Sequence, residues 1–271
     1  MPAVTPRRPL AVLLSTMLLL GSSVVPVAAQ EAGSAPIAPP SLETAVASLL
    51  VMRPAGEVYR ITAATLPQCK FKDKLTRYPK VKHWKKSLLD TRFKLPQSYS
   101  PWDLVSVSRA NIAGSGKVRK LMIADLKALA KAARQAGKPL AVRSAYRSYA
   151  YQKSLFRSYV AAHGWAQAVK FSARAGHSEH QLGTTVDFTV GPGVPLSTTF
   201  GDSPSGKWLA RNGWKYGFIM SYPKGKKNQS CYSYEPWHWR YFGRDLARRI
   251  HESGQVPRRY LYENFHADLM P

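Results

Sequence analysis

From residue 118 onward, apolar residues recur with two periods, one helical and one alternating. The helical period predicts a helix over 118–136, because Gly137 stands where a C-cap belongs and Pro139 prevents continuation. Residues 140–146 alternate and predict a short strand, after which Ser148 can cap a helix over 149–163. The same reasoning predicts strands over 184–190, 216–222 and 237–242, and helices over 207–212, 243–253 and 258–269.

Two of these strands carry chemically useful side chains. In the strand over 184–190, Asp187 falls on the face opposite the apolar Val186 and Phe188, so we expect Asp187 to point into a polar cleft. In the strand over 237–242, His238 and Arg240 share one face.

The N-terminal part of the chain has the pattern of an export signal. Arg7 and Arg8 precede an apolar run over 9–20, and small residues follow at 27–29. The run is too short to span a membrane, so residues 1–29 are predicted to be a signal peptide; the alternative is an uncleaved anchor.

The remainder of the chain contains no internal repeat and no boundary that divides it. Residues 30–58 are predicted to be a linker, since its first part is small and proline-rich, and residues 42–53 could form a short helix. Residues 59–271 are predicted to be one domain, with its core motifs in 140–242. Nothing in the sequence indicates an obligate dimer, so we expect a monomer.

The net charge of +25 implies a polyanionic neighbour. Removing residues 1–29 takes away two arginines and no acid, which leaves 25 − 2 = +23. Export disfavours nucleic acid and favours anionic wall polymers. The segment 70–94 interleaves lysine and arginine with aromatic residues, and the simplest interpretation is a solvated surface with aromatic anchors in the core.

The chain has two cysteines, Cys69 and Cys231. In an exported protein they could form one disulfide, and two buried free thiols are the alternative.

The candidate chemistry lies in two stretches, 176–190 and 235–241. Together they offer His180, His238, Asp187 and Glu235. Two histidines and one carboxylate can hold Zn²⁺ with a fourth position open, and the other carboxylate could act as a base. From the residues alone, Glu235 could instead be the metal ligand, and Asp187 could support the ligands without binding the metal.

Three motifs carry a resemblance to a known family. They are Tyr146-Arg147-Ser148 with Gln152, Ser178-Glu-His180-Gln-x-Gly183-x-x-x-Asp187, and Glu235-Pro-Trp-His238-x-Arg-Tyr241. In combination they resemble the VanY-type zinc D-alanyl-D-alanine carboxypeptidases, which are related in fold to the Hedgehog N-terminal domain. The resemblance covers roughly residues 89–261.

The resemblance implies a single compact α+β domain, with a small antiparallel sheet flanked by helices. It implies one zinc ion held by His180, Asp187 and His238, with Glu235 as the general base. Arg147 would stabilise the oxyanion or hold the substrate carbonyl. Ser178 and Gln152 would bind the terminal D-Ala and its carboxylate.

We therefore expect a secreted enzyme that removes the terminal D-Ala from peptidoglycan stem peptides outside the cytoplasmic membrane. The alternatives are an L,D-carboxypeptidase, a D,D-dipeptidase, an endopeptidase, or a non-catalytic wall-binding module. A nucleic-acid binder is a further class, which the predicted signal peptide disfavours.

Overall fold

The computed structural model describes residues 49–52, 58–61 and 65–267. The predicted signal peptide and most of the predicted linker lie outside these residues. Within the described ranges, no helix combines the length and apolar character needed to cross a bilayer.

A two-stranded hairpin precedes the domain in sequence. Strand β1 (Leu49–Met52) pairs antiparallel with β2 (Val58–Ile61). The helix expected over 42–53 is therefore wrong for residues 49–52, and the rest of that range is not described. A helix of that length is marginal without tertiary support, whereas pairing with β2 supplies backbone partners to all four residues.

The central sheet has five strands in the order β10-β11-β9-β8-β6. Three neighbouring pairs are antiparallel, as expected, while the edge strand β6 runs parallel to β8. The strands are β6 (Ala113–Gly114), β8 (Ala141–Ser144), β9 (Thr185–Thr189), β10 (Phe218–Met220) and β11 (His238–Tyr241). Two smaller ladders pair β3 (Lys74–Leu75) with β4 (Phe93–Lys94), and β5 (Leu104–Ser106) with β7 (Lys117–Arg119).

The first long helix starts later than its apolar period predicts. Residues 117–119 form β7, residues 120–122 a 3₁₀ turn, and only then does α1 (Ile123–Gln135) begin. The pairing of β7 with β5 supplies non-local hydrogen bonds that sequence periodicity does not register.

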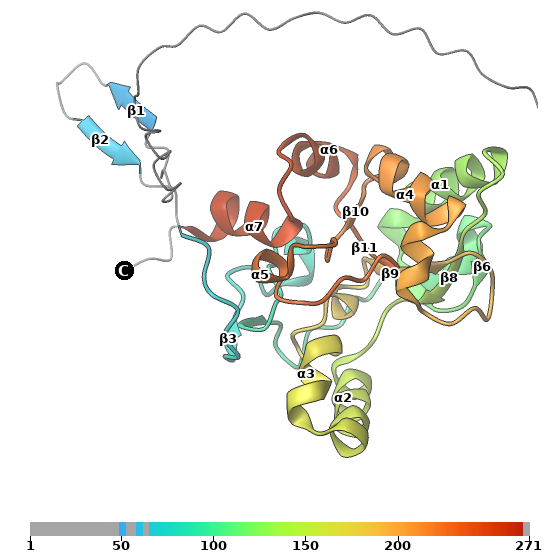
Figure 1. The fold of residues 1–271 in the computed structure, drawn as a ribbon, viewed down its shortest axis with the longest axis horizontal. Helices are drawn as coiled ribbons and strands as arrows, with labels where there is room; N and C mark the ends of the chain where they lie inside the picture. Colours follow the sequence, from blue (N-terminus) through green and yellow to red (C-terminus); the bar gives the residue numbers. More distant parts are fainter. Residues whose placement is uncertain (1–48, 53–57, 62–64, 268–271) are drawn as a thin grey trace, which may run out of the picture. The chain divides into compact units, whose positions relative to one another are not determined.

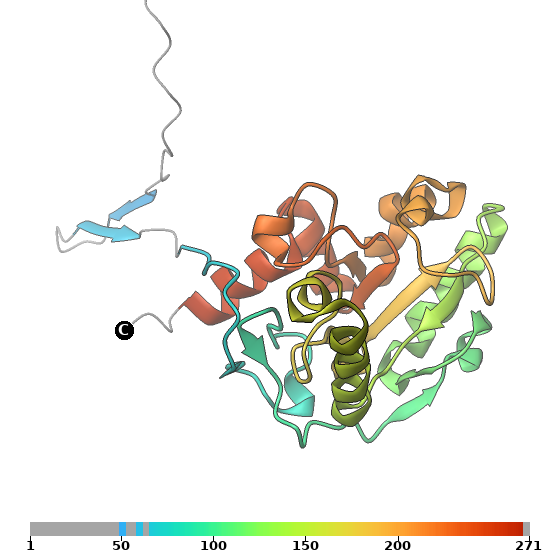
Figure 2. The ribbon, with the colours of Figure 1, turned by 60° about the horizontal axis from the view of Figure 1, so that its bottom comes forward.

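The second helix has the bounds that the sequence predicts. Helix α2 (Tyr149–His163) follows the N-cap Ser148, whose side chain accepts a hydrogen bond from the Tyr151 N–H. It packs against α3 (Trp165–Phe171), and the two form a pair in Figure 2. The remaining helices are α4 (Pro204–Asn212), α5 (Lys227–Ser230), α6 (Arg244–Glu252) and α7 (Pro257–Leu261), with a π-helical turn over 262–266.

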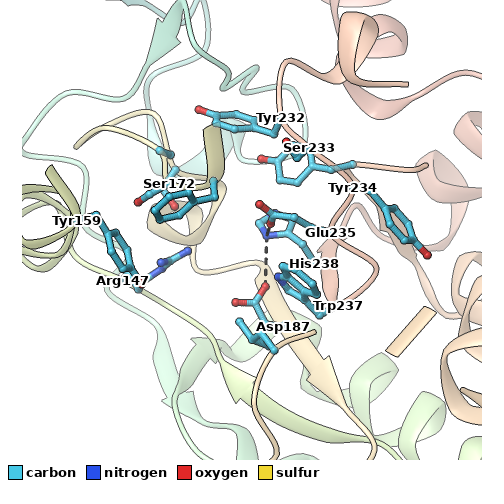
Figure 3. A pocket seen from close by; sticks show the side chains of 15 residues that line it. Arg147, Tyr159, Ser172, Asp187, Tyr232, Ser233, Tyr234, Glu235, Trp237 and His238 are labelled. Carbon is cyan, nitrogen blue, oxygen red and sulfur yellow. Dashed lines mark ion pairs between the residues drawn. The ribbon is translucent and has the colours of Figure 1, made fainter. Parts of the chain in front are cut away.

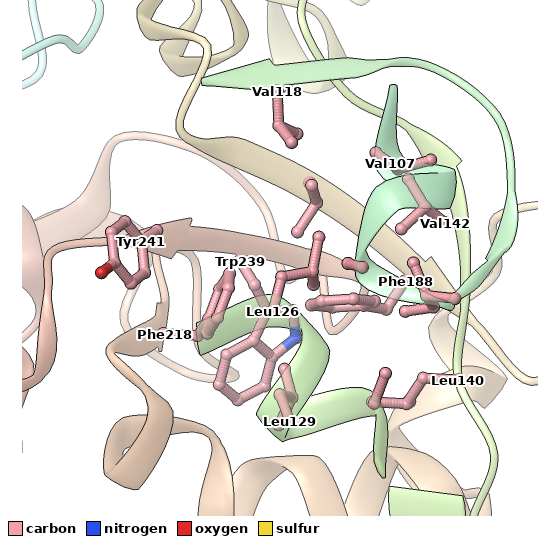
Figure 4. Close-up of a cluster of buried hydrophobic side chains, with 14 of the residues drawn as sticks. Val107, Val118, Leu126, Leu129, Leu140, Val142, Phe188, Phe218, Trp239 and Tyr241 are labelled. Carbon is pink, nitrogen blue, oxygen red and sulfur yellow. The ribbon is translucent and has the colours of Figure 1, made fainter. Parts of the chain in front are cut away.

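The main hydrophobic core lies on one face of the central sheet (Figure 4). Val186 and Phe188 from β9 and Trp239 from β11 pack there with Leu126 and Leu129 of α1. Successive side chains of a strand point to opposite faces, so the residues between them, at 187 and 238, face away from this core. The alternation along β9 therefore sets the side on which polar chemistry can occur, as the sequence predicted.

The segment 65–95 is bound covalently and by packing to the rest of the domain. Cys69 and Cys231 form a disulfide, with Cα atoms 5.2 Å apart. Trp84 and Phe93 are buried in two different hydrophobic clusters, while Phe71 is exposed. The interpretation as a basic surface with aromatic anchors holds for Trp84 and Phe93.

Replacing both cysteines with serine should lower the free energy of unfolding by about 5 kcal/mol, because the bond closes a loop spanning 162 residues. Urea unfolding of the oxidised protein and of the double variant measures this difference. Reductant should destabilise the wild type and leave the double variant unchanged. Equal midpoints for the oxidised wild type and the double variant would contradict the prediction.

Candidate metal centre and catalytic pocket

A tight turn that precedes β9 presents His180. The Ser178 hydroxyl accepts a hydrogen bond from the His180 N–H and so caps the 3₁₀ turn Glu179–Leu182. Gly183 ends the turn at φ +72°, where a Cβ atom would also approach the Arg119 side chain to 3.0 Å. The position therefore favours glycine on two grounds.

The sheet register places the other two candidate ligands opposite each other. His238 on β11 is the Cα partner of Asp187 on β9. His180 Nε2 lies 3.3 Å from one Asp187 carboxylate oxygen, and His238 Nδ1 lies 3.3 Å from the other. One donor atom from each of the three residues lies within 4.8 Å of the others. The structure thus brings together His180, Asp187 and His238, all of which are buried.

The two imidazoles present different nitrogens to this centre. His180 Nδ1 lies 2.6 Å from the Ala145 carbonyl, to which it can only donate, and this leaves the Nε2 lone pair free. His238 Nε2 lies 3.0 Å from a carboxylate oxygen of Glu179, so its Nδ1 faces the centre. These tautomers are assigned from the hydrogen-bond partners.

Unsatisfied polar atoms show that the centre suits a cation. His180 Nε2 and Asp187 Oδ1 are buried and make no hydrogen bond within the described part of the chain. Such atoms are costly to bury unless something binds them. Two imidazoles and one carboxylate, with room for a fourth ligand, form a donor set that Zn²⁺ takes in catalytic sites.

The metal-free centre carries a buried ion pair. Burial alone would lower the pKa of His238, but the neighbouring Asp187 and Glu179 carboxylates raise it to about 9. Burial and the nearby Arg147 guanidinium lower the pKa of His180 to about 4. A cation binding here must displace the His238 proton, and it finds His180 already neutral.

Glu235 lies beside two of the candidate ligands, Asp187 and His238 (Figure 3). Its carboxylate is 3.7 Å from His238 Nδ1, and 14% of its side chain is exposed. Burial raises the pKa of Glu235 to about 7 in the metal-free protein. A carboxyl group with this pKa can both accept and return a proton near neutral pH.

A cavity of about 270 Å³ opens over these groups. Asp187, Glu235 and His238 line it together with the predicted Arg147 and Ser178. The Arg147 side chain points into it, and its buried Nε makes no hydrogen bond within the described residues (Figure 3). An aromatic wall completes the cavity, formed by Tyr159, Phe171, Tyr222, Tyr232, Tyr234 and Trp237.

Gln152 is not among the residues that line the cavity. Its amide NH₂ donates to the Ala173 carbonyl over 2.6 Å, and Ala173 does line the cavity. The side chain therefore supports the wall from behind, and a direct contact between Gln152 and a substrate stays a prediction.

Sequence reasoning missed several residues of the site. It assigned no role to Glu179, although this acidic residue stands between Ser178 and His180 in the same turn. The sequence predicted that Arg240 shares a strand face with His238. It did not predict that Arg240 is fully buried. The aromatic wall comes from α2, α3 and the 222–237 region, and no spacing pattern connects them.

Comparisons with known proteins agree with this geometry. Residues 115–244 match the family described as VanY: D-alanyl-D-alanine carboxypeptidase. The chain is 39% identical over 173 residues to the putative carboxypeptidase YodJ of Bacillus subtilis (strain 168). That match covers 62% of this chain and 63% of YodJ, so the chain spans less than two thirds of that relative.

Two solved structures are similar over nearly their whole length. The LdcB LD-carboxypeptidase is 32% identical with a TM-score of 0.61, and the match covers 72% of this chain and 98% of LdcB. A VanY D,D-pentapeptidase from a VanB-type resistance cassette, solved as a mutant in complex with Zn(II), is 30% identical with a TM-score of 0.56. That match covers 66% of this chain and 99% of the other. The α+β fold and the three sequence motifs agree with these matches, and the chain belongs to the VanY D-alanyl-D-alanine carboxypeptidase family.

Proposed function

We propose that this chain is a secreted zinc carboxypeptidase that removes the terminal D-Ala from peptidoglycan stem peptides. The observation that carries the proposal is the buried His180–Asp187–His238 set beside the Glu235 carboxyl group, which lies 3.7 Å from His238 Nδ1. The family description and the Zn(II) complex of a solved relative support it.

In this proposal the chain's own residues divide the work. Zinc, held by the three ligands, would supply Lewis acidity at the scissile carbonyl. Glu235 takes a proton from the attacking water and returns it to the leaving amine. Arg147, a planar cation that points into the cavity, stabilises the negative charge that develops on the carbonyl oxygen. The Ser178 hydroxyl, on the cavity wall, would bind the terminal D-Ala carboxylate.

We place this activity outside the cytoplasmic membrane. The pattern over residues 1–29 and the Cys69–Cys231 disulfide both favour an oxidising compartment. The net charge of +25 suits a wall that contains anionic polymers, and we propose no role for nucleic acid.

An L,D-carboxypeptidase is the second candidate. The similarity to LdcB, whose name gives an LD-carboxypeptidase, favours it. Both reactions use the same catalytic groups, so the difference lies in the stereochemistry and length of the peptide that the cavity accepts.

Metal dependence and specificity can be tested together. We expect the purified protein to release D-alanine from a pentapeptide ending in D-Ala-D-Ala, to lose this activity with 1,10-phenanthroline, and to regain it with zinc. A pentapeptide ending in L-Ala is the control and should stay intact. A stem tetrapeptide is tested in parallel. If only this tetrapeptide is cut, the L,D-activity replaces the first proposal. If a folded, zinc-loaded protein cuts neither the D-Ala-D-Ala pentapeptide nor the tetrapeptide, the chain is a binding module.

A further inference from the structure

Glu179 is a buried carboxylate that the mechanism above does not use. It is 4% exposed and lies between three polar side chains, those of His238, Ser221 and Arg240. One carboxylate oxygen receives the Ser221 hydroxyl at 2.6 Å and lies 3.0 Å from His238 Nε2. The other receives an Arg240 N–H at 2.8 Å.

The arrangement keeps Glu179 ionised despite its burial. The buried Arg240 guanidinium forms an ion pair with the Glu179 carboxylate over 2.8 Å, and this favours the charged form over the neutral acid. Arg240 is itself fixed, because its other terminal nitrogen donates to the Trp84 and Ser87 carbonyls, each at 2.8 Å. The guanidinium thus connects the segment 65–95 to the turn that carries His180.

The ionised carboxylate determines which nitrogen of His238 carries a hydrogen. A carboxylate can only accept, so His238 Nε2 must be the donor in this contact. Once His238 is neutral, the Nδ1 lone pair faces Asp187, on the side where a cation would bind. Two contacts fix the rotation of the imidazole ring: the hydrogen bond to Glu179, and packing against the Tyr222 ring, whose centroid lies 4.6 Å from that of His238.

A buried Glu–Arg pair could instead serve stability alone. The chain contains such a pair elsewhere, because Asp90 is fully buried and its carboxylate binds Arg258. The Glu179 pair differs in that the same carboxylate oxygen that faces His238 is held by a second donor, Ser221. That oxygen is therefore oriented toward a ligand rather than toward its counter-charge.

We infer that Glu179, held by Arg240 and Ser221, is a positioning residue that orients His238 and keeps its Nδ1 free to bind the metal. This inference rests on the proposed zinc site and goes beyond it, because it assigns the affinity of the site partly to a residue that touches neither metal nor substrate. Partners of this kind typically change metal affinity about 10- to 100-fold.

The test is the zinc affinity of Glu179→Gln, measured by competition with a chromogenic chelator. Glutamine keeps the shape, but its NH₂ must face either Arg240, which is a clash of donors, or His238 Nε2, which would move the imidazole hydrogen to Nδ1. We expect zinc affinity to fall about 10- to 100-fold. We also expect kcat to fall when the site is saturated with zinc, with KM unchanged.

Asp90→Asn is the matched control, since it breaks a buried carboxylate–arginine pair away from the ligands. It should lower the unfolding midpoint and leave zinc affinity unchanged. Wild-type zinc affinity in a folded Glu179→Gln would overturn the inference while leaving the zinc enzyme intact. A wild type that binds no zinc would instead overturn the proposed function.

A second measurement needs no variant and covers the case in which Glu179→Gln does not fold. Long-range ¹H–¹⁵N spectra of the zinc-loaded wild type report the protonation of each ring nitrogen. We expect hydrogen on Nε2 of His238 and on Nδ1 of His180. Hydrogen on Nδ1 of His238 would overturn the inference.

Discussion

Glutamine in place of Glu235 should abolish most turnover and leave zinc binding unchanged. The carboxylate is 3.7 Å from His238 Nδ1, beside Asp187 and His238 rather than among the ligands, and its pKa is raised to about 7. Glutamine fills the same space but cannot take a proton from water. Loss of a general base typically costs about 10²- to 10⁴-fold in rate, so we expect kcat to fall by that amount with KM little changed.

Steady-state D-alanine release and metal analysis of the same preparation measure the two effects. Glu252→Gln is the control, because this exposed carboxylate pairs with Arg248 at the surface and should behave as wild type. A parallel loss of zinc and activity in Glu235→Gln would show that Glu235 is a ligand, the alternative that the sequence left open.

Asparagine in place of Asp187 should remove the metal itself. Asp187 supplies the one carboxylate of the candidate set, and each of its oxygens lies 3.3 Å from an imidazole nitrogen. Asparagine is a weaker, uncharged ligand. Loss of a residue that only orients a ligand lowers metal affinity by up to ~100-fold. We expect zinc affinity to fall by well over this amount when the ligand itself is replaced, and activity to fall with it.

The control for this change is Asp125→Asn. Asp125 forms an ion pair with Arg244 and accepts a hydrogen bond from the Tyr241 hydroxyl, but it lies outside the cavity. It should keep zinc and activity. If Asp187→Asn retains zinc at wild-type affinity, the ligand set proposed here is wrong.

Much of the site could be predicted because its residues lie in regular local structure. The alternation over 184–190 places Asp187 opposite Val186 and Phe188, and the five-residue strand β9 has that arrangement. The cap at Ser148 and the glycine at 164 give α2 its observed bounds.

The features that could not be predicted depend on non-local contacts. Apolar spacing suggested helix for residues 49–52 and 118–119, but the first pair with 58–61 and the second with 104–105 as strands. Glu179 looks like an ordinary surface acid in sequence, since its partners Ser221 and Arg240 follow 42 and 61 residues later. The position of Gln152 behind the cavity wall likewise depends on a non-local contact, the hydrogen bond that its amide donates to the Ala173 carbonyl.

The disulfide closes residues 69–231 into a covalent ring, and the residues after Cys231 form a linear C-terminal tail. The ring, from Cys69 to Cys231, contains Arg147, Ser178 and the ligands His180 and Asp187, whereas Glu235 and His238 belong to the tail. The candidate site is therefore the place where the tail pairs with the ring. A single cut by a protease in an exposed loop of the ring, such as residues 192–196, would leave every one of these groups in one covalent molecule until the disulfide is reduced.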